Sequence, residues 1–352
     1  MPTPKGVPTR KDVADLAGVS ETVVSYVINN NRYVAPEKRE RVLKAIEELK
    51  YRPSSIARAM KGKGVNAILF ICDNMTNEHF GKIVDEMDRL AYDRNYLISL
   101  IRGRNDERFV NQVLSHPFDG IVISSTDFDE KYVLQLIDSG IPVVLLINKM
   151  YYKIGDRASR IYTGLATGMK AAVRFLTGQG RRHILYVDRF SFHHGIRTIE
   201  DWRCISFITQ MQECGLQVSP NNILMGFETG EEMVRELDRR IGEGMKVDAV
   251  IGRNDEQAYV AMTALQQRGF RVPEDVSVIG FDNSSLSSYV SPQISSIDID
   301  RTAIAQAILQ FLDSALNGAP PQEIHLNAKL IERESTGPPS RPRQREGEGG
   351  AV

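Results

Sequence analysis

The sequence has little cysteine and no long apolar segment. Its three cysteines, Cys72, Cys204 and Cys214, are an odd number without a CxxC pair. They therefore predict neither a disulfide framework nor a zinc site, and we expect buried thiols. No apolar run approaches the roughly 20 residues that cross a membrane. The first residues, MPTPKGVPTRK, lack the apolar core of a signal peptide, so we expect a cytoplasmic protein.

Sequence motifs of common enzymes on parallel α/β folds are also missing. There is no GxSxG, P-loop, HExxH or Rossmann glycine fingerprint, and Gly62-Lys63-Gly64 precedes a strand-like run instead of following one. His193 and His194 have no third ligand at metal spacing, which favours a solvated loop. We therefore expect no catalytic residue, metal or cofactor. An enzyme or a small-molecule-binding protein on a doubly wound α/β fold is the alternative.

Charge is distributed unevenly along the chain, although its net value is only −1. Residues 1–63 carry 13 Lys and Arg against 7 Asp and Glu, a net charge of +6; the remainder carries 31 against 38, a net charge of −7. A basic head is what neutralising nucleic-acid phosphates requires, and an acidic body keeps the rest of the molecule off a duplex. Solvated surface residues alone would explain the charge but not its segregation.

Residues 10–29, RKDVADLAGVSETVVSYVIN, have the pattern of two short helices joined by a tight turn. Gly18 can take a positive φ in that turn, and Ser20 can cap the second helix. The two helices have the apolar faces Val13, Leu16, Ala17 and Val24, Val27, Ile28. This pattern predicts a helix-turn-helix, with a structural helical hairpin as the alternative for the stretch alone.

The second helix of this motif would direct three polar side chains outward. Glu21, Thr22 and Tyr26 lie on the face opposite the valines. A recognition helix presents base-reading side chains to the major groove from such positions. We therefore predict that these three residues read bases.

A third helix is predicted to begin at Pro36. Ala35, which precedes it, has no side-chain acceptor for a cap, at a cost of about 1 kcal/mol. Residues 54–61, SSIARAMK, have a helical pattern but are fewer than the ~12 to 15 residues that an isolated helix needs in water. A plain linker is the alternative there. The expected inner face of the third helix is Val42, Leu43, Ile46 and Leu49.

From Ala67 the apolar period becomes that of alternating strands and helices. The runs AILFI, YLISLI, GIVIS and PVVLLI alternate with helical stretches, and the pattern repeats with HILYV, DAVIG and VSVIG. Such alternation means parallel sheets covered on both faces, and its repetition suggests two lobes. We expect helices near residues 80–94, 108–114, 130–139, 168–177, 201–214, 231–241 and 255–268.

The first part of the chain resembles a known family. ADLAGVSETVVSYVIN, followed by VAPEKRERVLKAIEELKYRPSSIARAM, resembles the DNA-binding headpiece and hinge of the LacI/GalR family of bacterial transcriptional regulators. The resemblance implies a hinge helix at residues 54–61 that folds when two subunits pair over the minor groove. Met60, usually Leu in relatives, would be the wedge in a base step. The implied contacts with the DNA backbone are Ser20, Ser25, Asn29, Arg32 and Lys38.

The body of the chain resembles the effector-binding core of the same family. GIPVVLLIN, GRNDEQAYVAMTALQQRGFRVPEDVSVIGFDN and YVSPQISSI carry this resemblance, and the core is similar to periplasmic sugar-binding proteins. It implies chain crossings between the lobes near residues 162, 294 and 321. The expected parts are a headpiece (1–53), a hinge and linker (54–63), a core (64–336) with an N-lobe (about 64–161 and 295–320) and a C-lobe (about 162–294 and 321–336), and a disordered tail (337–352).

The resemblance also implies an effector site between the lobes. The family pattern falls on Arg203, Asn254 and Asp282, with Asn148 where relatives often have Asp. Caps or a surface ion pair are the alternative roles of these residues. The pattern departs from relatives at LATGMK and at Ser206, so no relative's effector transfers to this chain. Further candidates for the site are Phe227, His79 and Phe80.

Together these features predict a homodimeric, sequence-specific transcriptional regulator, most simply a repressor. Its partners would be a palindromic DNA operator and a small-molecule effector such as a sugar or sugar derivative. No membrane partner is expected.

Overall fold

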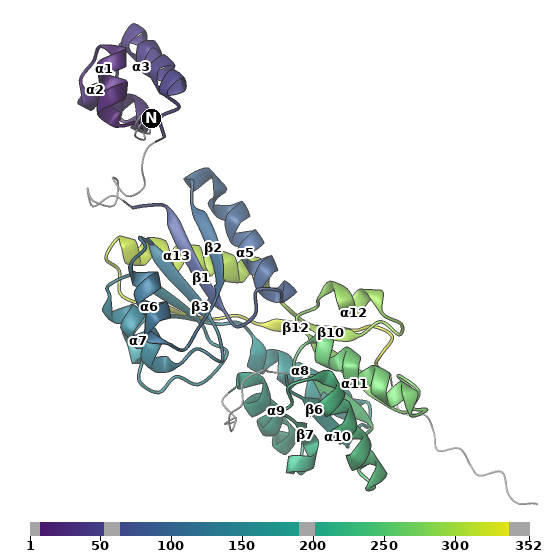
Figure 1. Cartoon of the computed structure of the whole chain (residues 1–352). Helices are drawn as coiled ribbons and strands as arrows, with labels where there is room; N and C mark the ends of the chain where they lie inside the picture. Colours follow the sequence, from purple (N-terminus) through teal and green to yellow (C-terminus); the bar gives the residue numbers. More distant parts are fainter. Residues whose placement is uncertain (1–7, 53–63, 190–200, 338–352) are drawn as a thin grey trace, which may run out of the picture. The chain divides into compact units, whose positions relative to one another are not determined.

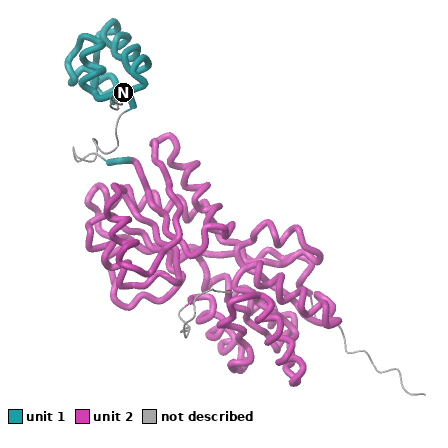
Figure 2. The backbone as a smooth tube through the Cα atoms, viewed as in Figure 1, with its two compact units in different colours: residues 1–65 teal, residues 66–352 magenta. Residues whose placement is uncertain are grey.

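The computed structural model describes residues 8–52, 64–189 and 201–337, and the chain divides into two compact units, residues 1–65 and 66–352 (Figure 2). The proposed hinge with Met60, the pair His193-His194 and the predicted tail beyond Gly337 lie outside the described residues. Each helix in the described part of the chain is too short or too polar to span a membrane.

Unit 1 contains a helix-turn-helix followed by a third helix, α1 (Arg10–Ala17), α2 (Glu21–Asn29) and α3 (Pro36–Leu49) (Figure 1). Thr9 caps α1 in a capping box with Asp12, and Gly18 ends it in the left-handed region at φ 63°. The Ser20 side chain accepts from the backbone N–H of Val23 and so begins α2. The turn is therefore held by local backbone chemistry, as the sequence predicted.

The core of this unit uses smaller side chains than we predicted. Leu16 and Leu43 are 48% and 50% exposed, whereas Ala14 and Ala45 are buried. In α3 the inward stripe follows Val42 and Ala45, and Leu43 is one step, or 100°, around the helix from Val42. Both leucines were therefore wrongly assigned to the core.

The described residues of unit 2 form two six-stranded sheets, one in each lobe. Every pair of neighbouring strands is parallel except β10 with β12. The N-lobe sheet has the order β11 (Glu323–His325), β5 (Ser159–Tyr162), β4 (Val143–Leu146), β3 (Gly120–Ser124), β1 (Ala67–Cys72), β2 (Leu97–Arg102). The C-lobe sheet has the order β12 (Ala328–Ile331), β10 (Ser295–Ile299), β9 (Ser277–Phe281), β8 (Ala249–Gly252), β6 (Ile184–Val187), β7 (Ile223–Leu224).

Helices cover both faces of each sheet and enclose two apolar clusters per lobe (Figure 1). The N-lobe helices are α5 (Glu78–Ala91), α6 (Glu107–Leu114), α7 (Glu130–Asp138) and α13 (Arg301–Leu316). The C-lobe helices are α8 (Leu165–Gly178), α9 (Trp202–Glu213), α10 (Gly230–Gly242), α11 (Asp255–Gln267) and the short α12 (Ser285–Tyr289). Single 3-10 turns lie at Tyr92–Arg94, Gly155–Arg157 and Pro220–Asn222. This is the predicted two-lobed α/β core.

Over residues 64–189 and 201–337 the chain passes between the lobes three times. It crosses after β5, after β10 and between β11 and β12. The last two crossings lie about five residues beyond the predicted positions 294 and 321, because β10 pairs with β9 and β12 in the C-lobe sheet while β11 pairs with β5. At the first crossing Gly164 has φ 90°, and a Cβ there would lie 2.6 Å from the backbone nitrogen of Ala328.

The cysteines do not form disulfides. Cys72 and Cys204 are buried as expected, while Cys214 is only half-buried. Burial raises the pKa of the Cys72 and Cys204 thiols to about 12, so both stay protonated at neutral pH.

We expect Ala35→Ser to stabilise α3, because Ala35 is its N-cap and makes no side-chain cap hydrogen bond. A serine oxygen there would accept a hydrogen bond from a backbone N–H of the first turn and add about 1 kcal/mol to the stability of the helix. Hydrogen exchange of α3 amides in the full chain should slow by about fivefold. Ala35→Val, which also lacks an acceptor, is the control and should not slow exchange; equal exchange in the serine variant and wild type would contradict the prediction.

Candidate functional site

The outer face of α2 carries the predicted base-reading residues. Glu21 and Thr22 are exposed in its first turn, and Tyr26 is half-buried one turn later. The Tyr26 hydroxyl accepts a hydrogen bond from Arg32 Nη1 at 3.2 Å, and the Arg32 guanidinium lies 5.2 Å from the ring centre. Arg32 therefore braces Tyr26 from the loop after α2, a contact that the sequence did not predict.

The predicted DNA-backbone residues lie around α2 and at the start of α3. The Ser20 side chain is partly used as a cap, and Asn29 Nδ2 donates to the carbonyl oxygen of Ser25 at 2.7 Å. Lys38 is exposed in the first turn of α3. Lys38 and Arg32 are therefore the two positively charged side chains among the predicted DNA-backbone residues.

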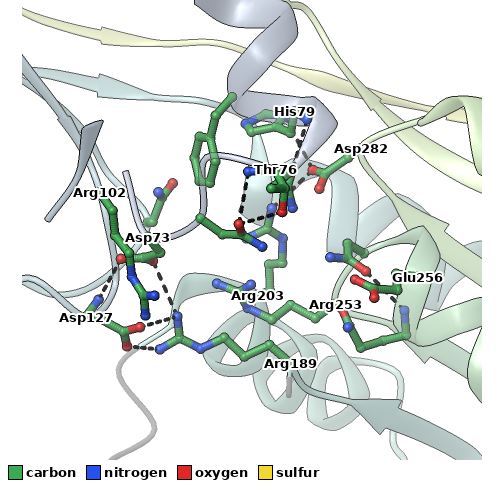
Figure 3. Close-up of a pocket in the computed structure, with 16 residues that line it drawn as sticks. Asp73, Thr76, His79, Arg102, Asp127, Arg189, Arg203, Arg253, Glu256 and Asp282 are labelled. Atoms are coloured by element: carbon green, nitrogen blue, oxygen red, sulfur yellow. Dashed lines mark hydrogen bonds and ion pairs between the residues drawn. The ribbon is translucent and has the colours of Figure 1, made fainter. Parts of the chain in front are cut away.

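A cavity of about 330 Å³ lies between the two lobes of unit 2 (Figure 3). Its wall consists largely of residues at or just after the carboxyl ends of parallel strands and in the first turns of helices that follow them. This is where open α/β sheets bind ligands. Its lining residues are Asp73, Asn74, Thr76, Asn77, His79, Phe80, Arg102, Asp127, Asn148, Arg189, Arg203, Arg253, Asn254, Glu256, Gln257 and Asp282.

Arg203 and Asp282 form a buried pair in this wall. Arg203 Nη2 donates to Asp282 Oδ1 at 3.3 Å, and its guanidinium lies 5.4 Å from the ring centre of Phe281. The same oxygen of Asp282 lies 3.6 Å from His79 Nδ1, on the other lobe. Arg203 is thus a buried cavity residue and not part of a surface ion pair.

The charge state of this group follows from burial and from its neighbours. Burial lowers the pKa of His79 to about 4, so the ring is neutral at pH 7. Burial alone would raise the pKa of Asp282, but its charged neighbours hold it below its usual value. Because His79 is uncharged at neutral pH, the guanidinium groups of Arg203, Arg301 and Arg253 are what keep this carboxylate ionised.

The floor of the cavity contains a second buried ion cluster. Arg253 donates to Asp201 Oδ2 from Nε at 3.0 Å and from Nη2 at 2.8 Å, and its Nε lies 3.4 Å from Asp188 Oδ1. Asp201 also caps α9, the helix that carries Arg203. The two arginines are therefore positioned by one acidic residue.

The remaining predicted effector residues have different positions. Asn148 donates to Ser124 Oγ at 2.9 Å, and Asn254 caps α11 while lining the cavity, so the two roles that we weighed for it coincide. Phe80 lines the N-lobe side. The structure does not bring Phe227 to the cavity. It follows the edge strand β7 and packs against the apolar cluster beneath α10 and α11.

Several charged residues in the cavity were not predicted from the sequence. Asp73, Asp127 and Arg189 come after β1, β3 and β6, and Arg102 ends β2. The signal for all of them was the same: a charged residue at or just beyond the carboxyl end of a predicted parallel strand.

Three buried polar atoms of the cavity wall have no hydrogen-bond partner within the described residues. They are His79 Nδ1, Arg203 Nε and Gln257 Oε1. Leaving such an atom unsatisfied costs about 1–3 kcal/mol, so each is a natural partner for a polar ligand or water. Arg203 Nε is a hydrogen-bond donor and Gln257 Oε1 is an acceptor.

Comparisons with known proteins agree with this two-part organisation. Residues 9–54 match the model of bacterial regulatory proteins of the lacI family, and residues 173–336 match a periplasmic binding protein-like domain. The chain is 31% identical over 310 residues to the HTH-type transcriptional repressor PurR of Vibrio parahaemolyticus, covering 86% of this chain and 90% of that protein. It is 28% identical over 338 residues to PurR of Pasteurella multocida, covering 93% and 98%.

Solved structures share the fold. A lac repressor dimer bound to operator and an anti-inducer has a TM-score of 0.77 at 22% identity, covering 94% of this chain and 99% of that one. The regulator CelR in complex with cellobiose has a TM-score of 0.67 at 24% identity, covering 93% and 99%.

A helix-turn-helix unit on the same chain as a two-lobed ligand-binding core defines a DNA-binding transcriptional regulator, not an enzyme. The chain belongs to the LacI family of bacterial regulatory proteins.

We expect the pH dependence of stability to depend on His79. Its pKa is lower in the folded state, about 4 against 6.5, so the unfolded chain binds a proton first as the pH falls. Stability should therefore fall between pH 6.5 and about 4, by up to about 1.4 kcal/mol per pH unit. Urea unfolding of wild type and His79→Gln across this range measures the difference.

His79→Gln should lack this loss of stability. Burial raises the pKa of Asp255 to about 6, which stabilises the folded state as the pH falls, but this contribution is common to both proteins and cancels in the comparison. Parallel pH profiles for the two proteins would show that His79 is not the responsible group.

Proposed function

We propose that this regulator is a homodimeric repressor that binds a palindromic operator in the cytoplasm, where the chromosome lies. The basic headpiece, with 13 Lys and Arg against 7 Asp and Glu in residues 1–63, supports binding to a polyanion. A single recognition helix reads only a few base pairs, so two headpieces on a symmetric site supply the rest. The lac repressor structure with the same fold is a dimer bound to operator, which also supports this assembly.

We assign base reading to the outer face of α2. A glutamate can only accept hydrogen bonds, so cytosine N4 is the natural partner of the exposed Glu21, while Thr22 is permissive. Tyr26 is braced by Arg32, which supports a fixed orientation of its hydroxyl toward a second base edge or a phosphate. Ser20, Ser25, Asn29, Arg32 and Lys38 are the proposed backbone contacts.

We propose that Met60, outside the described residues, is the minor-groove wedge of a hinge that folds on DNA. An apolar side chain between base steps unstacks them at a cost of a few kcal/mol, which the bent complex offsets. An eight-residue segment is too short to be a stable helix by itself. DNA affinity then depends on how the two cores hold the hinges.

We expect Glu21→Ala to relax base preference at one operator position by about 1–3 kcal/mol. Lys38→Ala is the matched control, because a phosphate contact carries no sequence information: it should weaken binding equally on all sequences and reduce the salt slope by about one. Selection from randomised duplexes, followed by titrations at several salt concentrations, separates the two effects. Unchanged base preference in Glu21→Ala would remove it from the readers.

We propose that the effector binds in the cavity between the lobes and is a small, hydroxyl-rich molecule such as a sugar or sugar derivative. The observation that carries this proposal is the Arg203–Asp282 pair beside His79, with further amide and carboxylate side chains around the cavity. A hydroxyl group donates and accepts at once, and adjacent carboxylates, guanidinium groups and amides match vicinal hydroxyls.

The composition of the wall favours this class over a flat nucleobase. Phe80 supplies the only hydrocarbon ring among the cavity-lining residues that are described. A base would leave its second face against polar groups, whereas a polyol satisfies them. CelR, which shares the fold, is known in complex with cellobiose, a consistent ligand class.

We expect Asp282→Asn to abolish the effector response and to leave basal operator affinity nearly unchanged. The substitution removes the carboxylate that orients Arg203 in the cavity, while the headpiece is untouched, and coupling requires both sites. A thermal-shift screen of sugars, sugar acids and nucleobases identifies a ligand, which at a hundred times its Kd adds about 2.7 kcal/mol to stability. Operator titrations with and without that ligand measure the response.

The matched control is Asp238→Asn, which breaks the partly exposed pair with Arg268 in the same lobe. It should respond to the ligand like wild type. If the ligand stabilised Asp282→Asn as much as wild type, the effector would bind elsewhere; a screen in which only nucleobases stabilise the protein would replace the polyol class.

A further inference from the structure

One arginine crosses the cleft and joins the lobes. Arg189 follows β6 of the C-lobe, and its Nη1 lies 3.3 Å from Asp73 Oδ2 and 3.2 Å from Asp127 Oδ2, both in the N-lobe (Figure 3). Its Nη2 also contacts Asp127 Oδ1. One guanidinium is thus shared by two carboxylates of the opposite lobe, and its two-point contact with Asp127 is the strong, geometrically defined form of an ion pair.

The carboxylate of Asp73 is held in place independently of Arg189. Asp73 accepts from the backbone nitrogen of Thr126 at 2.8 Å, from Thr126 Oγ1 at 2.9 Å and from Ser125 Oγ. These bonds lie entirely within the N-lobe, between the residues after β1 and those after β3. The N-lobe therefore fixes the position of one carboxylate, that of Asp73, which the arginine meets when the lobes are together.

The bridge is partly shielded from solvent. The side chains of Arg189, Asp73 and Asp127 are 18%, 15% and 32% exposed. Ion pairs at this depth are stronger than surface pairs but are still weakened by salt. Figure 3 shows this group at one end of the cavity, with Glu256 toward the other.

Other polar contacts between the lobes lie elsewhere. Besides the His79–Asp282 contact, Arg301 of α13 donates to the carbonyl oxygen of Asp282. Glu78 on α5 accepts from the backbone nitrogen of Ser285 on α12 at 3.0 Å, and the backbone nitrogen of Trp202 donates to the carbonyl oxygen of Asn148 at 3.0 Å. None of these contacts involves Asp73 or Asp127.

We propose that Arg189 is a positioning residue of the effector site, holding the lobes closed without any effector. Its regulatory meaning rests on the function proposed above, because closure orients His79 and Asp282, from opposite lobes, around the ligand. Opening of the lobes then breaks the bridge to Asp73 and Asp127. The bridge forms again when the lobes close around the effector, and this raises the affinity for the effector. Removing the bridge raises the open-to-closed ratio by about fivefold or more.

The chain contains its own reporter of closure. Trp202 is its only tryptophan, and although it begins α9 of the C-lobe, its side chain packs against both apolar clusters of the N-lobe. Opening of the cleft withdraws the indole from those clusters into a more polar environment. Its emission maximum and its quenching by acrylamide therefore follow the lobes in full-length protein, with no ligand and no DNA.

The test compares wild type with Arg189→Gln in the absence of ligand. We expect the variant to show red-shifted Trp202 emission and stronger acrylamide quenching. Wild type should move in the same direction as NaCl rises from about 0.1 M to about 1 M, while the variant stays nearly constant because its bridge is already absent. Arg174→Gln, which breaks a pair with Glu213 inside the C-lobe, is the control and should resemble wild type.

A charge exchange separates positioning from a general loss of stability. Asp127→Arg and Arg189→Glu should each open the cleft. The double variant should recover part of the wild-type quenching and emission, because the exchanged pair can form again while Asp73 repels the carboxylate introduced at position 189. If Arg189→Gln does not fold, Asp127→Asn removes one of the two ion pairs of the bridge and takes its place, with a smaller change expected. Wild-type fluorescence in the substituted proteins, or an equal change in Arg174→Gln, would overturn the proposal.

The outcome is independent of the effector proposal, because no ligand is present. A failed ligand screen with altered Trp202 quenching would leave the bridge in place and remove only its regulatory role. An effector response that persists in Arg189→Gln, together with unchanged Trp202 quenching, would remove the proposed role of the bridge and leave the proposed function in place.

Discussion

The three crossings between the lobes constrain the rest of the core. Because β10, β12 and α8 belong to the C-lobe while β5, β11 and α13 belong to the N-lobe, the two sheets are covalently joined on one side only. Each lobe has its own apolar clusters on both faces of its sheet, so the lobes can move as bodies about the crossings without loss of packing. The polar cavity lies between the two lobes, so such movement directly changes the distances between its N-lobe and C-lobe side chains.

The cavity is rich in charge, yet its arginines are largely neutralised by neighbouring carboxylates. Arg203 pairs with Asp282, Arg253 with Asp201 and Asp188, and Arg189 with Asp73 and Asp127. Pairing offsets the desolvation cost that unpaired buried charges would impose. It also leaves hydrogen-bonding atoms available around fixed positions, which suits recognition of a neutral polar ligand better than simple attraction of an anion.

Local rules predicted much of this molecule. Gly18, Ser20 and the uncapped Ala35 have the positions that turn and cap chemistry predicted, and Asp282 and Asn254 lie in the cavity because strand ends meet at one edge of a sheet. Leu16 and Leu43 were misplaced because a three-helix core has room for alanine where a wider apolar stripe was assumed. Phe227 was misplaced because its strand is at the sheet edge, a position that periodicity does not reveal.

The sequence by itself determined the element types, the helix-turn-helix, the division of charge and the family, since these depend on residues close together in the chain. Only the tertiary structure decided which distant residues meet. Arg189 lies 116 residues from Asp73, and Arg203 lies 79 residues from Asp282. Such pairs form because strand order in two sheets and the crossings between them place their ends around one cavity, and no local pattern specifies strand order.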